Sequence, residues 1–238
     1  MKTQNFLSLA AIALTAMLIS TPAKGQIVWG SAATIASDSD VATNGTYFDA
    51  ALLQDGANSG APLTVNGVVF NIIPHGNVAS DPSGDISLNS SRNPFSGGDS
   101  PSGTSAYNTL VSEPEYGQNN SQTLTLNNLT IGDTYQVEVW SAAIGSSAFV
   151  TDLSGTNSPS LNAKTGQFVI GTFTATASTF SFTASNDATS VNGVNMLNAI
   201  SVFNEGEQET VPEPSTYALL LGSVAALVFI RSRQPARR

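Results

Sequence analysis

The strongest constraint on the fold is an alternation of apolar and polar residues that recurs from Gln26 to Phe203. Clusters of Gly, Asn, Ser and Asp interrupt the alternation at short intervals, and no helical stripe of apolar residues runs through it. Because successive side chains of a strand point to opposite faces, a period of two indicates strands that bury one face. The sequence therefore predicts an all-β domain over residues 26–204.

Two segments predict hairpins. The first pairs residues 121–130 with residues 134–140 around a turn at Ile131, Gly132 and Asp133, whose residue types suit a tight connection. The second pairs residues 167–176 with residues 179–185. In both, one strand face is apolar; these faces carry Tyr135, Val137 and Val139 in the first hairpin, and Phe180, Phe182 and Ala184 in the second.

Further strands are expected at residues 65–73, with Val68, Phe70 and Ile72 on one side, and at residues 195–203, with Ile200 and Val202 inward. Weaker strands are expected around Val28, Ile86, Leu110 and Phe149. About nine short strands in this length predict a two-sheet antiparallel β-sandwich of jelly-roll type.

Leu129, Gly132 and Tyr135 have the Leu-x-x-Gly-x-x-Tyr spacing of the corner in fibronectin-type and immunoglobulin-like sandwiches. In that corner the phenol bonds to the backbone around the bend. A fibronectin-like or immunoglobulin-like sandwich is therefore the alternative topology.

The domain is acidic and contains no cysteine. Between the two chain ends, Arg92 and Lys164 are the only basic residues against sixteen carboxylates, a formal charge of about −14. This charge repels phosphate backbones and anionic lipids, so neither nucleic acid nor an anionic membrane surface is expected as a partner. Without disulfides, stability must come from burial in the core.

The N-terminus has the features of a secretory signal peptide. Lys2 precedes an apolar stretch from Phe6 to Ser20, and small residues follow before Gln26. This order predicts a helical signal peptide over residues 1–25, and with it the secretion translocon and signal peptidase as partners.

The C-terminus has three parts in a fixed order. The sequence Val211, Pro212, Glu213, Pro214 and Ser215 leads into an apolar segment, residues 217–230, and then into Arg231, Arg233, Arg237 and Arg238. As a helix the apolar segment would be about 21 Å long, against a hydrocarbon core of roughly 30 Å. Arg231 and Arg233 are expected to stop the segment on the cytoplasmic side, which places the domain across the membrane.

The motif from Val211 to Ser215, the short span and the arginine cluster closely resemble the PEP-CTERM sorting signal. The resemblance covers residues 211–238. It implies recognition of the Pro-Glu-Pro motif by an exosortase, transient membrane insertion through residues 217–230, and a location at the bacterial surface or in an exopolysaccharide matrix. An ordinary single-span anchor is the alternative.

The domain also resembles, more diffusely, jelly-roll β-sandwich modules that bind carbohydrate. The resemblance lies in the stretches at residues 40–45, 65–70 and 197–202. No sugar-binding position can be matched, so it implies a fold and assigns no site.

Few residues suggest catalysis. The only histidine, His75, lies in a Pro-His-Gly turn, and there is no cysteine nucleophile, zinc ligand set or Gly-x-Ser-x-Gly elbow. A glycosidase pair could be drawn from Glu113, Glu115 and Glu138. We expect no enzymatic activity, with a glycoside hydrolase as the less favoured alternative.

Two kinds of ligand suit the remaining polar and aromatic residues. Asp38, Asp40 and Asn44 offer oxygen ligands for a structural calcium ion, although acidic loops often only face solvent. Four aromatic residues could form a sugar-stacking platform or belong to the core; they are Trp29, Tyr107, Tyr116 and Trp140. No other cofactor is expected.

Two segments are expected to be irregular. Residues 81–105, rich in Ser, Gly, Pro and Asp, predict a mobile or binding loop. Residues 205–210 predict an acidic linker to the sorting tail. Together these features predict a non-catalytic surface or matrix protein associated with exopolysaccharide or adhesion, with a secreted carbohydrate-binding module as the alternative.

Overall fold

The computed structural model describes nine stretches of the chain, namely residues 25–53, 62–74, 78–89, 92–94, 104–112, 114–117, 121–144, 149–157 and 159–207. The expected signal peptide up to residue 24, the sorting motif from Val211 to Ser215, the span at 217–230 and Arg231 and Arg233 lie outside the described residues. Within the described stretches, no helix has both the length and the apolar character needed to cross a bilayer.

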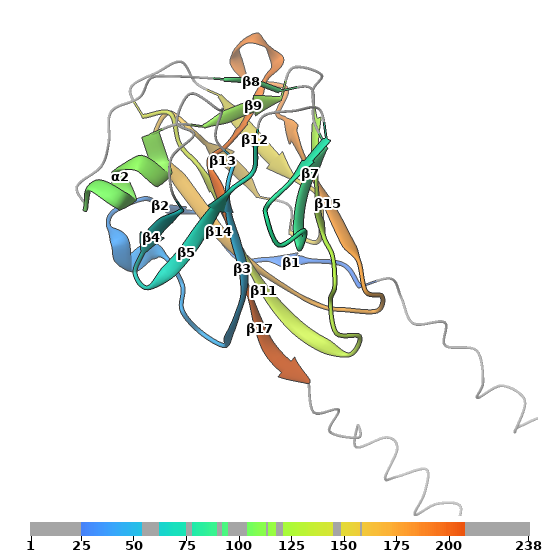
Figure 1. Ribbon diagram of the computed structural model, residues 1–238. Coiled ribbons are helices and arrows are strands. Elements are labelled where there is room, and N and C mark those ends of the chain that lie inside the picture. The colour runs from blue at the N-terminus through green and yellow to red at the C-terminus, as the bar shows by residue number, and fades with distance from the viewer. Residues whose placement is uncertain are drawn as a thin grey trace, which may run out of the picture. The chain divides into compact units, whose positions relative to one another are not determined.

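The larger sheet has eight strands (Figure 1). Their order is β1 (Val28–Trp29), β14 (Gln167–Thr174), β11 (Asp133–Ser141), β17 (Ala199–Glu207), β3 (Thr46–Leu52), β5 (Val68–Ile72) and β4 (Leu63–Val65), with β2 (Ala33–Thr34) also paired to β14. All neighbours are antiparallel except β3 and β5, which are parallel, so the expectation of a wholly antiparallel sandwich is wrong at this pair.

The second sheet has six strands in the order β13 (Ser160–Asn162), β12 (Val150–Leu153), β15 (Phe180–Asn186), β10 (Ser121–Leu126), β7 (Ile86–Asn89) and β6 (Val78–Ser80). A small third sheet joins β16 (Asn195–Leu197), β9 (Glu115–Gly117) and β8 (Arg92–Pro94). The helical elements are α2 (Ser105–Ser112) and two 3-10 turns, η1 (Asp38–Asp40) and η3 (Val191–Gly193). The described residues thus form a two-sheet β-sandwich with small additions.

The main core fills the space between the two large sheets. Tyr135, Val137 and Val139 of β11 face Leu124 and Leu126 of β10, and all five are buried. Phe182 and Ala184 of β15 and Ile200 and Val202 of β17 belong to the same cluster, as the alternation predicted.

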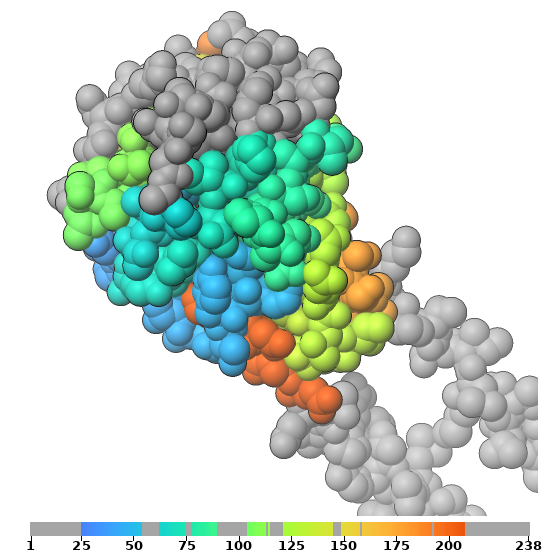
Figure 2. Space-filling view, viewed as in Figure 1, coloured from blue at the N-terminus to red at the C-terminus, as the bar shows by residue number. Residues whose placement is uncertain are grey.

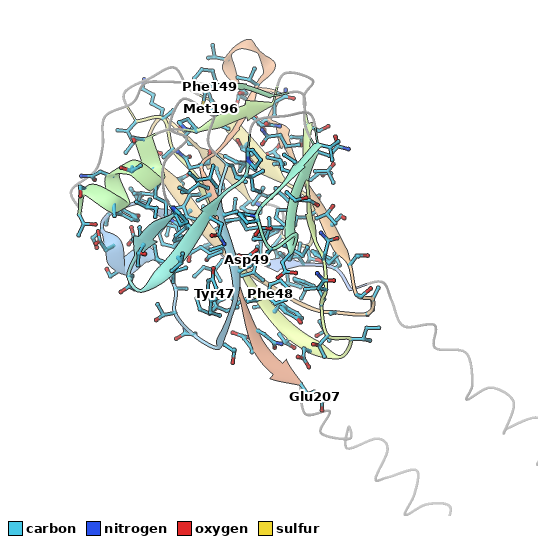
Figure 3. The ribbon with its side chains drawn as sticks, in the orientation of Figure 1. Tyr47, Phe48, Asp49, Phe149, Met196 and Glu207 are labelled. Carbon is cyan, nitrogen blue, oxygen red and sulfur yellow. The ribbon has the colours of Figure 1, made fainter. Side chains whose placement is uncertain are left out.

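A second core covers the opposite face of the larger sheet. Trp140 of β11 and Ala50 of β3 lie there under Tyr107 and Leu110 of α2 and Phe70 of β5. The larger sheet is therefore buried on both faces over β11, β17 and β3. A small third cluster contains Phe149 and Met196, which Figure 3 places together near β8 and β9, far from Glu207.

Both expected hairpins are wrong. β10 and β11 belong to different sheets, and so do β14 and β15. The connections are arches across the sandwich, and their backbones bond to each other: Leu129 N–H donates to the Ser178 carbonyl at 3.0 Å, and Gly132 N–H to the Ala175 carbonyl at 2.8 Å. Each arch thus satisfies backbone polar groups of the other, while the two strands that it joins pair within different sheets.

The tyrosine corner is confirmed. The hydroxyl oxygen of Tyr135 accepts a hydrogen bond from the backbone N–H of Thr130 at 2.8 Å. Gly132 has a φ of 99°, a conformation that glycine adopts without strain. The corner turns the chain from one sheet into the other.

Three further expectations are corrected. Residues 65–73 are not one strand, because Asn66 and Gly67, with φ of 48° and 80°, form a tight turn between β4 and β5. Leu110 lies in α2 rather than in a strand, since Tyr107, Leu110 and Val111 have the spacing of a buried helix face. Residues 195–203 divide at Asn198 into β16 and β17.

The expected irregular segments contain regular structure. Residues 81–105 include β7, β8 and the first residue of α2. Glu205, Gly206 and Glu207, expected in the acidic linker, continue strand β17. The described strands also outnumber the nine that were expected, because many contain only two to four residues.

Replacing Tyr135 with Phe should destabilise the domain by about 1–3 kcal/mol, because the Thr130 N–H would lose its acceptor at the corner. Chemical denaturation measures this change. Tyr47→Phe is the control, since the Tyr47 hydroxyl donates to the Val69 carbonyl from a side chain that is 42% exposed. Equal losses in the two variants would contradict a special role for the corner.

Candidate functional site

The outer face of β11 carries an unusual buried acid, Glu138. It alternates with Val137 and Val139, so it points away from the main core and into the second one. Its side chain is 0% exposed. One carboxylate oxygen, Oε2, accepts the Ala42 N–H at 2.9 Å, while Oε1 has no partner among the described residues.

The environment of Glu138 disfavours its charged form. Burial raises its pKa to about 8, and the nearby Asp40 carboxylate adds to the rise, against the hydrogen bond from Ala42. Three other side-chain atoms on this covered face have no hydrogen-bond partner among the described residues, namely Gln136 Nε2, Trp140 Nε1 and Ser201 Oγ. Ser201 is directly opposite Glu138 in the pairing of β11 with β17. Buried polar atoms without a protein partner are typical binding sites for ordered water.

Asp40 organises the segment that covers this face. Its Oδ2 accepts three hydrogen bonds, from Ala36 N–H at 2.6 Å, Ser37 N–H at 3.0 Å and the Tyr107 hydroxyl at 2.6 Å. Burial raises the pKa of Tyr107, and the bond to Asp40 raises it further. Asp40 therefore joins η1 to α2 above Glu138.

Asp38 performs a related task at the surface. Its Oδ1 accepts the Thr104 N–H at 2.9 Å, a contact that lowers the pKa of Asp38. Thr104 in turn caps α2 through its hydroxyl, which accepts the Tyr107 N–H at 3.2 Å. Asn44, the third expected calcium ligand, is exposed. Within the described stretches, no three His, Cys, Asp or Glu side chains gather as a metal-binding group.

Of the two alternatives for the four aromatic residues, a place in the core is confirmed for three of them. Trp140 is buried against Phe70 and Phe168, with ring centroids 5.8 and 6.4 Å apart. Trp29 and Tyr107 are also buried. They fill cores because the larger sheet is covered on both faces. The side chain of Tyr116 lies outside the described part of the chain.

Among the described residues, the candidate glycosidase carboxylates form no pair. Glu138 is enclosed, while Glu113, His75 and the side chain of Glu115 lie outside the described residues.

A second acidic pair, Asp49 and Asp81, was not anticipated from the sequence. Asp49 lies on β3, where Figure 3 shows it beside Tyr47 and Phe48, and Asp81 begins the turn between β6 and β7. They are 2% and 4% exposed. The Ser83 hydroxyl lies 3.0 Å from Asp49 Oδ2 and 2.5 Å from Asp81 Oδ2. The pair therefore connects the two large sheets.

The hydrogen bonds around Ser83 require an additional proton. Its hydroxyl has one hydrogen and two carboxylate neighbours, so two ionised acids would leave one contact without a donor. Burial raises the pKa of Asp49 to about 6, and Asp81 adds to this rise. Burial acts to raise the pKa of Asp81 as well, but hydrogen bonds from Ser83 and Ile86 outweigh it and lower that pKa. Asp49 is thus the acid that carries a proton, and it does so below about pH 6.

The chain was compared with known protein families, curated proteins and solved structures, and none of them matches it. The site must therefore be interpreted from its own chemistry.

Replacing Glu138 with Gln should remove one pH dependence of stability. A folded pKa of about 8, above the usual 4.5 of a glutamate, means that the stabilisation by Glu138 is complete below pH 4.5 and is lost as pH rises through 8. Within this window the free energy of unfolding should fall by up to about 1.4 kcal/mol per pH unit. Denaturation of both proteins between pH 4.5 and 8.5 measures it. Parallel curves for wild type and variant would contradict the prediction.

Replacing Asp49 with Asn should raise the melting temperature at pH 8 but not at pH 4. The folded pKa of about 6, above the usual 3.8 of an aspartate, makes Asp49 stabilising below pH 3.8 and progressively less so as pH rises through 6. The amide supplies the missing donor at every pH. Asp152→Asn is the control, because Asp152 bonds to Ser160 on the outer face of the second sheet. An Asp49→Asn variant with a lower melting temperature than wild type at pH 8 would contradict the assignment of this proton to Asp49.

Proposed function

We propose that the chain is an exported bacterial surface or extracellular-matrix protein, sorted by an exosortase through its Pro-Glu-Pro tail. The observation that carries this proposal is the ordered tail of Val211 to Ser215, an apolar segment and terminal arginines, opposite a signal-peptide-like N-terminus. Both ends give the same topology, since Arg231 and Arg233 favour the cytoplasmic side and the signal peptide directs the rest outward.

The sorting tail is expected to be temporary. A span of residues 217–230 is short for a lasting anchor, so it holds the chain in the membrane until the exosortase acts. The prolines on both sides of Glu213 prevent a regular helix and present an extended segment to an enzyme groove. The mature protein then keeps the sandwich and loses the span.

The ectodomain is proposed to act without catalysis, in adhesion or in association with exopolysaccharide, within a jelly-roll-like sandwich. The burial of Glu138 supports a non-catalytic role, because the acid with the most strongly raised pKa would not meet a substrate. No cofactor is proposed. The second candidate is a carbohydrate-binding module, favoured by the uncharged outer face of β6, β7, β10 and β15 in the second sheet.

Mass spectrometry of the protein released from the cell surface tests the sorting proposal. The expected product begins near Gln26 and ends close to the motif from Val211 to Ser215, and Glu213→Gln or deletion of the exosortase gene should leave the tail attached. A surface protein that retains Arg238 in wild-type cells would overturn it. Gln208→Ala, in the chain just before the motif, is the matched control and should be processed normally.

A further inference from the structure

The outer face of the second sheet is hydroxyl-rich and uncharged over β6, β7, β10 and β15, while Asp152 lies on the same face on the neighbouring strand β12. Ser80, Ser87, Thr125 and Ser181 lie opposite one another on β6, β7, β10 and β15 and form one row across the sheet. Asn89, Thr123 and Thr183 form a second row beside it. Figure 2 shows the green surface of β6 and β7 next to the yellow-green surface of β10.

None of these four strands contains a charged residue. This contrasts with the formal charge of about −14 on the rest of the region between the chain ends. The hydroxyls repeat at about the 4.8 Å spacing of neighbouring strands, which is close to the length of one pyranose ring. Each hydroxyl can donate and accept a hydrogen bond; the hydroxyl oxygens of Thr125 and Ser181, for example, are 2.8 Å apart.

A groove of about 320 Å³ lies at the end of the first row, and Ser181 belongs to both the groove and the row. Its walls include Gln26, Ile27, Ser154, Phe180 and Phe182; no charged side chain lines it, although the amino group of the proposed mature chain, which begins near Gln26, would lie at its edge. The Phe180 ring is half-buried and stacks on the buried Phe173, with centroids 3.9 Å apart. The groove therefore offers a fixed aromatic ring beside polar groups, and its volume suits a small ligand.

We propose that this groove and the row Ser80, Ser87, Thr125 and Ser181 bind a neutral polysaccharide chain. One sugar ring enters the groove and contacts the exposed part of Phe180, whose ring otherwise packs against the main core, and the following sugars hydrogen-bond to the row of hydroxyls on the outer face. The charge distribution selects the occupant: the surrounding acidic surface repels anionic polymers, and the uncharged face fits a chain that carries hydroxyls alone. This inference rests on the proposed association with exopolysaccharide and defines its surface and its polymer class.

Affinity electrophoresis and calorimetry on the mature protein, with dextran, xylan and β-glucan against anionic alginate, test the proposal. We expect saturable binding to at least one neutral polymer and none to alginate. Phe180→Ala should weaken binding about tenfold or more, and the double variant Thr125→Val with Ser181→Ala about fivefold or more, since two hydrogen bonds are lost. Thr172→Val, on an exposed position of the larger sheet, should bind as wild type does.

Several results would overturn the proposal. They are an absence of binding to every neutral polymer, binding to alginate alone, an equal loss in Thr172→Val, or a dimer in sedimentation that dissociates on Thr125→Val. The double variant guards against a misfolded Phe180→Ala, because it changes only surface hydroxyls. The tail could still be processed correctly in each case, so mass spectrometry distinguishes failure of this inference from failure of the sorting proposal.

Discussion

The burial of strand β11 on both faces is the constraint on which the rest of the domain depends. One face places Tyr135, Val137 and Val139 in the main core, and the other places Glu138 and Trp140 in the second core. Burying a large apolar side chain contributes about 1.5–3 kcal/mol. In a chain without cysteine, this double burial takes the place that disulfides hold in many exported domains.

The alternation of residues was sufficient to predict the strands but not their partners. Leu124, Leu126, Phe180 and Phe182 do face the main core. A period of two tells which face of a strand is apolar, yet it does not distinguish a hairpin from an arch. The Leu129, Gly132 and Tyr135 spacing carried that information, because such a corner passes between sheets, and the structure confirms its hydrogen bond. The Asn66 and Gly67 pair was a second turn signal within one expected strand.

The buried acids could not have been located from the sequence in the same way. Glu138 occupies a polar position in the alternation, which ordinarily means a solvent-facing side chain. It is enclosed because Ala42 and Tyr107, distant in the chain, cover that face through η1 and α2. Asp49 is similar, since its neighbours Asp81 and Ser83 come from the other sheet. The alternation left Tyr107 and Trp140 open between a sugar-stacking platform and the core, and the second core uses both.

These features suit a domain that works outside the cell. Its core is large, and its buried acids are held by hydrogen bonds. Native-state hydrogen exchange on the mature protein tests the central claim that doubly buried β11 holds the domain together. The account predicts that β11 amides exchange only with global unfolding, more slowly than those of edge strand β6. Exchange of β11 through local opening, at rates like those of β6, would contradict it.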